Sequence, residues 1–130
     1  MKSLNPSTIH SPFARYSHGI EIGSPARLVV VSGQLGVTVD DVIPDRVQDQ
    51  AARCLANIDA ILADAQMSRR HVLRLNAYVT DRAHMQGYMT ARDTWLQAID
   101  PPPASTLMIV SGFTRPEFKV EIEALAASHL

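Results

Sequence analysis

The segment KVEIEA at residues 119–124 alternates strictly between charged and apolar side chains, as expected for a strand with two unlike faces. In an extended strand the three apolar residues fall on one face, while Lys119, Glu121 and Glu123 fall on the other. Burying an unpaired carboxylate is costly, so the charged face must meet water, a partner or a polar cavity. The segment therefore predicts a strand with one packed face and one face that is free to form a site.

Two helices are predicted before this strand. Residues 45–66 carry apolar side chains at helical spacing, and Pro44 suits a helix start. A second helix is predicted from Ala83 to Ala98, and the proline run at residues 101–103 ends it. Each helix has an apolar side that is expected to pack against a sheet.

Five strands are predicted from alternation or from short β-branched runs. They cover residues 16–22, 28–31, 71–80, 105–111 and 118–126, after an extended arm at residues 1–15. The order of elements is then ββαβαββ, which predicts an α+β fold of two layers, with two helices on one face of one sheet. We expect a single domain over residues 1–130. The uncovered sheet face mixes polar and apolar residues, which is typical of an oligomer interface.

The composition argues against several classes of function. The net charge of −1 lacks the basic excess of nucleic-acid-binding proteins, and no apolar run approaches the roughly 20 residues of a membrane span. The single cysteine, Cys54, excludes an internal disulfide, and we interpret it as a buried inert thiol. The five histidines lack metal-ligand spacing and no cofactor motif occurs, so neither a metal nor a cofactor is expected. Because no signal-peptide core is found, we interpret the protein as cytoplasmic.

Several short motifs occur in an order that is typical of one known family. They are Tyr16-x-His18-Gly19, Val31-Ser32-Gly33-Gln34-Leu35, Asn57-Ile58-Asp59-Ala60-Ile61-Leu62, Val79-Thr80-Asp81, Pro103-Ala104 and Val120-Glu121-Ile122-Glu123-Ala124. Over residues 12–127 the chain thereby resembles the RidA/YjgF family, also called the endoribonuclease L-PSP family. The resemblance implies a chorismate-mutase-like fold assembled as a homotrimer with clefts between neighbouring subunits. It also implies cofactor-free hydrolysis of small reactive enamines and imines to ketoacids and ammonia.

The chain departs from this family at the cleft. Active deaminases of the family carry an arginine directly after the Pro-Ala pair, where it binds the substrate carboxylate, but here the position is Ser105. A hydroxyl offers one donor and no positive charge, so the usual amino-acid-derived imines are expected to bind poorly. On the second helix Met89 and Arg92 stand where relatives often carry asparagine and tyrosine. Arg92 could supply the missing charge, or it is a surface or interface arginine, since exposed arginine is the norm.

Glu121 and Ser105 are the predicted catalytic residues. Glu121 matches the family's cleft glutamate, which would position a water or act as general acid and base. The alternative is a solvated or interface-paired carboxylate. Ser105 could hydrogen-bond a ligand oxygen or the water, but no adjacent base is evident that would make it a nucleophile.

The remaining predicted site residues would bind substrate. Tyr16 matches an aromatic residue at the border of the cleft, although packing at an interface would explain it equally. Ser32 and Gly33 match strand-end positions whose backbone contacts the ligand, and Gly33 also suits a strand end. Thr106 follows Ser105 and is otherwise an ordinary β-branched strand residue.

Three functions were weighed on this basis. The first is a trimeric hydrolase or deaminase that acts on a small imine, enamine or related metabolite. The second is a non-catalytic trimer that binds a small metabolite in the same cleft. RNA cleavage, suggested by the family's older name, is disfavoured because the chain has no basic stripe for phosphates.

Overall fold

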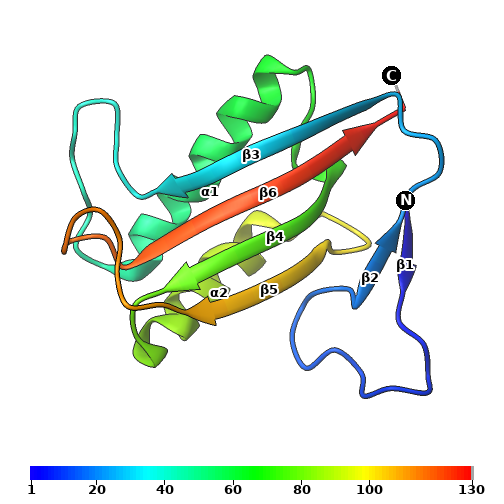
Figure 1. Ribbon diagram of the computed structural model, residues 1–130, viewed down its shortest axis with the longest axis horizontal. Coiled ribbons are helices and arrows are strands. Elements are labelled where there is room, and N and C mark those ends of the chain that lie inside the picture. Colours follow the sequence, from blue (N-terminus) through cyan, green and yellow to red (C-terminus); the bar gives the residue numbers. More distant parts are fainter. Residues whose placement is uncertain (130) are drawn as a thin grey trace.

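A four-stranded mixed sheet with two helices on one face forms most of the protein, and the computed structural model describes residues 1–129 (Figure 1). The strands are β1 (Lys2–Leu4), β2 (Gly19–Glu21), β3 (Arg27–Leu35), β4 (Val72–Val79), β5 (Ala104–Ile109) and β6 (Val120–Ser128). The helices are α1 (Val47–Asp64) and α2 (Met85–Trp95), with short 3-10 turns at Arg69–His71 and Arg82–His84. The predicted fold class, a mixed sheet with two helices on one face, is confirmed.

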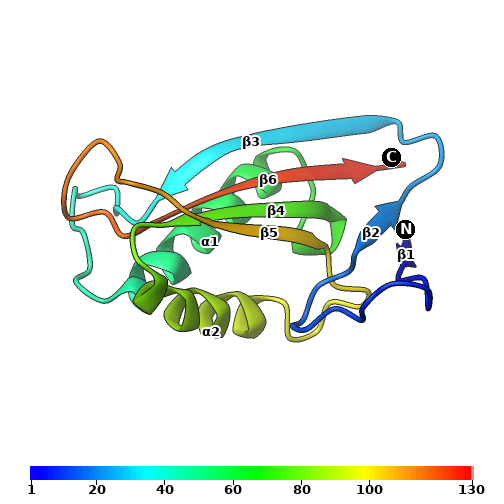
Figure 2. The ribbon, with the colours of Figure 1, turned by 60° about the horizontal axis from the view of Figure 1, so that its bottom comes forward.

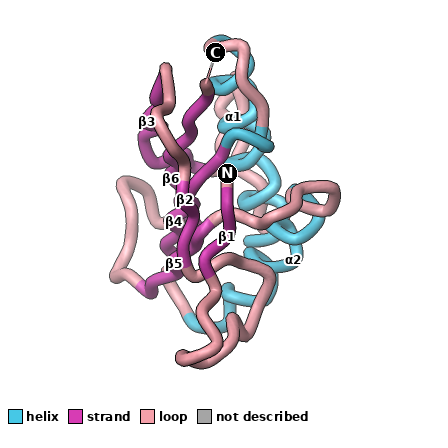
Figure 3. The backbone as a smooth tube through the Cα atoms, turned by 90° about the vertical axis from the view of Figure 1, so that its right-hand side faces the viewer, coloured by secondary structure: helices cyan, strands magenta, loops and turns pink. Residues whose placement is uncertain are grey.

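The main sheet has the strand order β3-β6-β4-β5. β6 runs antiparallel to both of its neighbours, whereas β4 and β5 are parallel and are joined through α2. Both helices lie against the same face, which leaves the opposite face without a covering layer (Figures 2 and 3). We call this opposite side the open face.

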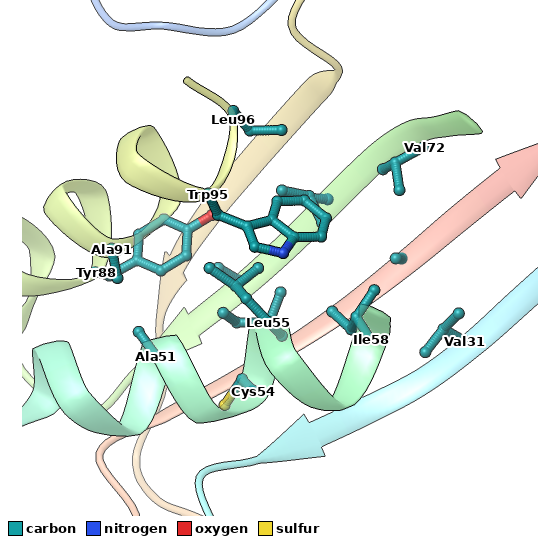
Figure 4. Packing of buried hydrophobic residues seen from close by; sticks show 14 of the residues in the cluster. Val31, Ala51, Cys54, Leu55, Ile58, Val72, Tyr88, Ala91, Trp95 and Leu96 are labelled. Atoms are coloured by element: carbon teal, nitrogen blue, oxygen red, sulfur yellow. The ribbon is translucent and has the colours of Figure 1, made fainter. Parts of the chain in front are cut away.

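The core lies between the helices and the sheet. α1 turns its apolar stripe inward through Cys54, Leu55 and Ile58, and Figure 4 shows Trp95 of α2 beside Leu55. Each fully buried Leu or Ile side chain stabilises the fold by roughly 1.5–3 kcal/mol relative to an exposed one. Burial raises the pKa of Cys54 to about 12, so its thiol stays protonated and inert at neutral pH, as expected from the sequence.

The two helices are held closely together. A Cβ on Gly87 would lie 2.6 Å from Val47 Cγ1, so only glycine allows α2 to approach α1 at this crossing. Farther along, Trp95 Nε1 donates to Asp59 Oδ2 at 2.9 Å, and Arg69 Nη2 donates to the same oxygen at 2.6 Å. These contacts fix the orientation of α2, which carries several residues of the candidate site.

The N-terminal region differs from the predicted order. Strand β1 lies within the segment predicted to be an extended arm, and it pairs with β2 in a separate two-stranded sheet. The strand predicted at 16–22 is therefore shorter and lies outside the main sheet. The start of the predicted segment 16–22 is instead held just before β5. There Ser17 N donates to Pro103 O at 3.1 Å, and Ser17 Oγ donates to Pro102 O at 2.6 Å.

Strand β3 is longer than predicted. Its backbone pairing with β6 begins at Arg27 and ends at Leu35, beyond the predicted end at Val31. The register shifts between Val31 and Gln34. This shift is a β-bulge, and it places Ser32 and Gly33 in an irregular part of the strand.

None of the helices in residues 1–129 is both long enough and apolar enough to cross a membrane.

Candidate functional site

A chain of hydrogen bonds crosses the open face of the sheet. Glu123 Oε1 accepts from Tyr78 Oη at 2.6 Å and from Asn76 Nδ2 at 3.1 Å. Arg74 donates to Asn76 Oδ1 and to Thr106 Oγ1, both at 2.7 Å. The hydrogen bond to Glu123 raises the pKa of Tyr78, because the carboxylate favours the protonated phenol. Both Glu123 and the predicted binding residue Thr106 therefore have partners within the chain.

Glu121 lies on the same face, next to the bulge of β3. A Cβ on Gly33 would overlap Glu121 Oε1, so the missing side chain of the glycine makes room for the carboxyl group. Burial raises the pKa of Glu121, and the nearby charge of Glu123 raises it further. A carboxyl group whose surroundings raise its pKa and that lies beside an open stretch of backbone is a candidate for proton transfer.

A separate pocket of about 240 Å³ lies beside α2, at the β5 side of the sheet. Its walls are mostly apolar and come from the N-terminal arm, α2 and β5: Phe13, Ala14, Tyr16, Met85, Met89, Arg92, Ser105 and Leu107. Small-molecule sites are typically concave and apolar with a few convergent polar groups, which is the character of this pocket.

The arm beside this pocket carries a row of rings in edge-to-face contact. The ring centroids of Phe13 and Tyr16 are 5.9 Å apart, and those of Tyr16 and His18 are 5.7 Å apart. His10 extends the row beyond Phe13 at 6.3 Å. Such contacts orient the aromatic rings relative to one another, so the predicted residue Tyr16 is held at the border of the pocket.

Arg92 is the charged residue of the pocket wall, and only 4% of it is exposed. Its guanidinium carbon lies 5.6 Å from the ring centroid of Tyr88, one helical turn earlier. Arg92 Nε donates to Asp93 Oδ1 at 3.0 Å. Nη2 forms an ion pair with the same oxygen at 2.9 Å, although the angles do not make a hydrogen bond. The buried hydroxyl of Tyr88 makes no hydrogen bond of good geometry. Burial raises the pKa of the phenol, and Arg92 and Ser105 lie near enough to offset part of that rise.

The structure divides the predicted site residues between two places. Tyr16, Arg92 and Ser105 line the pocket beside α2. Glu121 lies on the open face beside the bulge that holds Ser32 and Gly33, and Thr106 lies on that face near Arg74. The strand register explains the division: Ser105 pairs with the core residue Leu75, whereas Glu121 pairs with Tyr78. Within one chain, the two predicted catalytic residues are therefore on opposite sides of the sheet.

Sequence reasoning missed several residues that shape the pocket. Phe13, Met85 and Leu107 line it, and Tyr88 lies against Arg92. The spacing of Tyr88 four residues before Arg92 was a usable signal, because such residues are neighbours on a helix. Phe13 lies in a segment without periodicity, so no pattern could have placed it.

Among residues 1–129, no group of three or more His, Cys, Asp or Glu side chains is arranged to hold a metal ion.

Comparison with known proteins gives consistent matches. Residues 8–128 match the protein family described as Endoribonuclease L-PSP. A relative from Escherichia coli (strain K12), named "Putative reactive intermediate deaminase TdcF", is 32% identical over 115 residues, which cover 85% of this chain and 84% of that protein. A crystal structure of E. coli TdcF with bound serine has a TM-score of 0.72 at 26% identity and covers 98% of both chains. YyfB from Yersinia pestis, a protein of unknown function of the conserved Rid family, has a TM-score of 0.85 at 26% identity over 97% of both chains.

Proposed function

The chain belongs to the endoribonuclease L-PSP family, also called RidA/YjgF, and from this membership we propose that it hydrolyses a small reactive imine or enamine and releases ammonia. The observation that carries the proposal is Glu121, whose pKa is raised and whose carboxyl group occupies the space left open by Gly33. The name of the E. coli relative TdcF, a reactive intermediate deaminase, supports the same reaction class.

The proposed site is completed by assembly as a homotrimer. The open face exposes apolar side chains that water would solvate poorly, including Val30, which is 80% exposed, and Met108, which is 54% exposed. A second copy on this face would cover them, as is usual for exposed apolar patches. It would also bring the pocket residues of one subunit close to Glu121 of its neighbour, since the two groups lie on different sides of one chain.

The proposed reaction is addition of water to the carbon of the C=N bond. Glu121 accepts a proton from the attacking water as the C–O bond forms and passes it to the imine nitrogen, which gives a carbinolamine. Glu121 then takes the proton of the carbinolamine hydroxyl and delivers it to the nitrogen as the C–N bond breaks, so the products are a carbonyl compound and ammonia. In this scheme the Ser105 hydroxyl donates to a substrate oxygen or to the water.

A trapping assay tests the proposal. An amino-acid oxidase generates imines from a panel of amino acids, and semicarbazide captures the imine that survives. We expect the wild type to speed imine loss for at least one amino acid, and Glu121→Gln to slow that catalysis by about 100-fold or more. The matched control is Glu117→Gln, at an exposed position away from the bulge, which should behave like the wild type.

Two results would count against a deaminase. Either the wild type accelerates the loss of no imine in the panel, or Glu121→Gln hydrolyses imines as fast as the wild type. The first result together with tight binding of a small metabolite would favour the second candidate, a non-catalytic binding trimer. That candidate draws its support from Ser105, which stands where active relatives carry an arginine.

A further inference from the structure

The side-chain amide of Gln50 in α1 joins separate segments of the chain near the end of the sheet that carries Glu121. We propose that Gln50 is a positioning residue, which holds the start of β6 so that the carboxyl group of Glu121 stays in the space left open by Gly33. The inference rests on the proposed function in one respect, because it takes Glu121 to be the residue that transfers the proton.

The first step of the argument is the complete pairing of the Gln50 amide. Nε2 donates to Pro44 O at 2.7 Å and to Glu117 O at 2.9 Å, and Oε1 accepts from Lys119 N at 2.9 Å. Both N–H donors of the amide and its oxygen are therefore used, although Gln50 is fully buried. Because a buried polar group without a partner is costly, these bonds hold the loop before α1 and the loop before β6 to one fixed point.

The second step is that Gln50 reaches Glu121 through Lys119. The N–H of Lys119 donates to Gln50, its carbonyl accepts from Thr80 N at 3.2 Å, and its ammonium group donates to Asp45 O. Strand β6 begins directly after Lys119, and Glu121 is its second residue. A displacement of Lys119 would therefore move Glu121 relative to the rest of the sheet.

The third step is that α1 fixes the end of β3 as well. A Cβ on Gly36 would lie 2.7 Å from Cα and from Cβ of Gln50, so only glycine lets the chain pass this close to the helix. Leu35 pairs with Glu121, and its carbonyl accepts from Asn57 Nδ2 at 3.4 Å. Asn57 follows Gln50 by about two helical turns and so lies on the same side of α1. The helix thereby fixes the start of β6 relative to the end of β3, where the carboxyl group of Glu121 lies.

Gln50→Met tests the inference on the purified full chain, because methionine is about as long as glutamine but cannot make these hydrogen bonds. The carboxyl group of Glu121 should then move toward water. Its pKa, which burial raises in the wild type, should fall toward the usual 4.5 in an NMR titration. In the imine-trapping assay kcat should fall about tenfold and KM should change by less than about twofold, because the proton transfer is impaired and the pocket beside α2 is intact.

Leu62→Ala is the matched control. Leu62 is also fully buried in α1, about three turns after Gln50, and its truncation also lowers stability. If Gln50 positions Glu121, Leu62→Ala should leave the pKa of Glu121, kcat and KM as in the wild type. A role of Gln50 in stability alone would make the two variants behave alike in these measurements.

Hydrogen exchange of the wild type provides an independent test in case Gln50→Met fails to fold. The Lys119 N–H lies just before β6, yet it donates to the oxygen of a fully buried side chain. It should exchange about 1,000-fold more slowly than the same N–H in an unstructured peptide, because it is released only when the segment opens. Exchange at the rate of the unstructured peptide would overturn the inference.

The inference is also overturned if folded Gln50→Met keeps the raised pKa of Glu121, or if Leu62→Ala lowers this pKa equally. Its outcome can be separated from that of the proposed function. A fall of this pKa in Gln50→Met alone, in a protein that hydrolyses no imine, would support the positioning role and refute the deaminase. Hydrolysis of imines by Gln50→Met at the wild-type kcat would support the deaminase and refute the inference.

Discussion

The two faces of β6 differ sharply in burial, because buried and half-exposed residues alternate along the strand from Val120 to Ala126. Val120 and Ile122 are fully buried beneath the helices, whereas Glu121 and Glu123 project from the open face. The buried face is completed by α1 and α2 of the same chain, but the open face has no such layer. If the proposed function holds, one strand carries the core on one face and the reaction site on the other, so substitutions one residue apart should change different measured quantities.

The largest effect is expected on the buried face. Ile122→Ala leaves a cavity beneath the helices and should lower the free energy of unfolding by about 2–5 kcal/mol. Urea unfolding measures the change, and Val39→Ala, at a position that is 99% exposed, should differ from the wild type by less than about 0.5 kcal/mol. Equal free energies of unfolding for these two variants would contradict the burial of Ile122 beneath the helices.

A charge on the open face should instead act on assembly. If three copies meet there, Val30→Lys weakens association by about 100-fold or roughly 2.7 kcal/mol, because the interface would have to bury an ammonium group. Light scattering should then give a mass near the 14.3 kDa of one chain in place of three times that value. The circular dichroism spectrum should stay native. A Val30→Lys variant that remains trimeric would place the interface elsewhere.

A smaller change at Gly33 should affect chemistry with little cost in stability. In Gly33→Ala the added methyl group overlaps Glu121 Oε1, and the flexible carboxyl end must move away. We expect imine turnover to fall about tenfold, which is roughly 1.4 kcal/mol in activation free energy. The thermal midpoint should shift by only a few degrees. Unchanged turnover would mean that the position of the Glu121 carboxyl group does not matter for the reaction.

The smallest expected effect is on the pH dependence of stability. Because folding raises the pKa of Glu121, the folded state favours the protonated form, and the associated stability is lost as the pH rises through that pKa. Glu121→Gln should therefore be more stable than the wild type at pH 7, by a fraction of a kcal/mol after solvent screening. The advantage should vanish below the usual pKa of 4.5. Thermal unfolding at several pH values and one fixed protein concentration measures this.

Much of the fold was predictable because periodicity reports on burial. Residues 45–66 were predicted as a helix and α1 covers Val47–Asp64, while the strand predicted at 71–80 is β4. Strand β1 could not be predicted, because its partner β2 is held in place by hydrogen bonds from Ser17 to the distant residues Pro102 and Pro103.

The candidate site was harder to predict than the fold. The sequence resemblance assigned Ser105 and Glu121 to one cleft. The face of the sheet on which each residue lies depends on how its strand pairs with β4, and the local sequence does not reveal this pairing. Arg92 is buried against Tyr88, although arginine is usually exposed, because the aromatic ring one turn earlier covers it. Family resemblance could identify the position of Arg92 but not its burial.

The position of β6 in the sheet has a consequence for the order of events during synthesis. β6 follows every other strand along the chain, yet it lies between β3 and β4 and pairs with both. As the chain leaves the ribosome, β4 and β5 can pair early, but β3 has no neighbour in the main sheet until residues 120–128 emerge. The apolar stripe of α1 also packs partly against β6, so it stays exposed until β6 has been synthesised. Nascent chains therefore expose these segments until synthesis has passed β6, and this interval is when they depend most on chaperones.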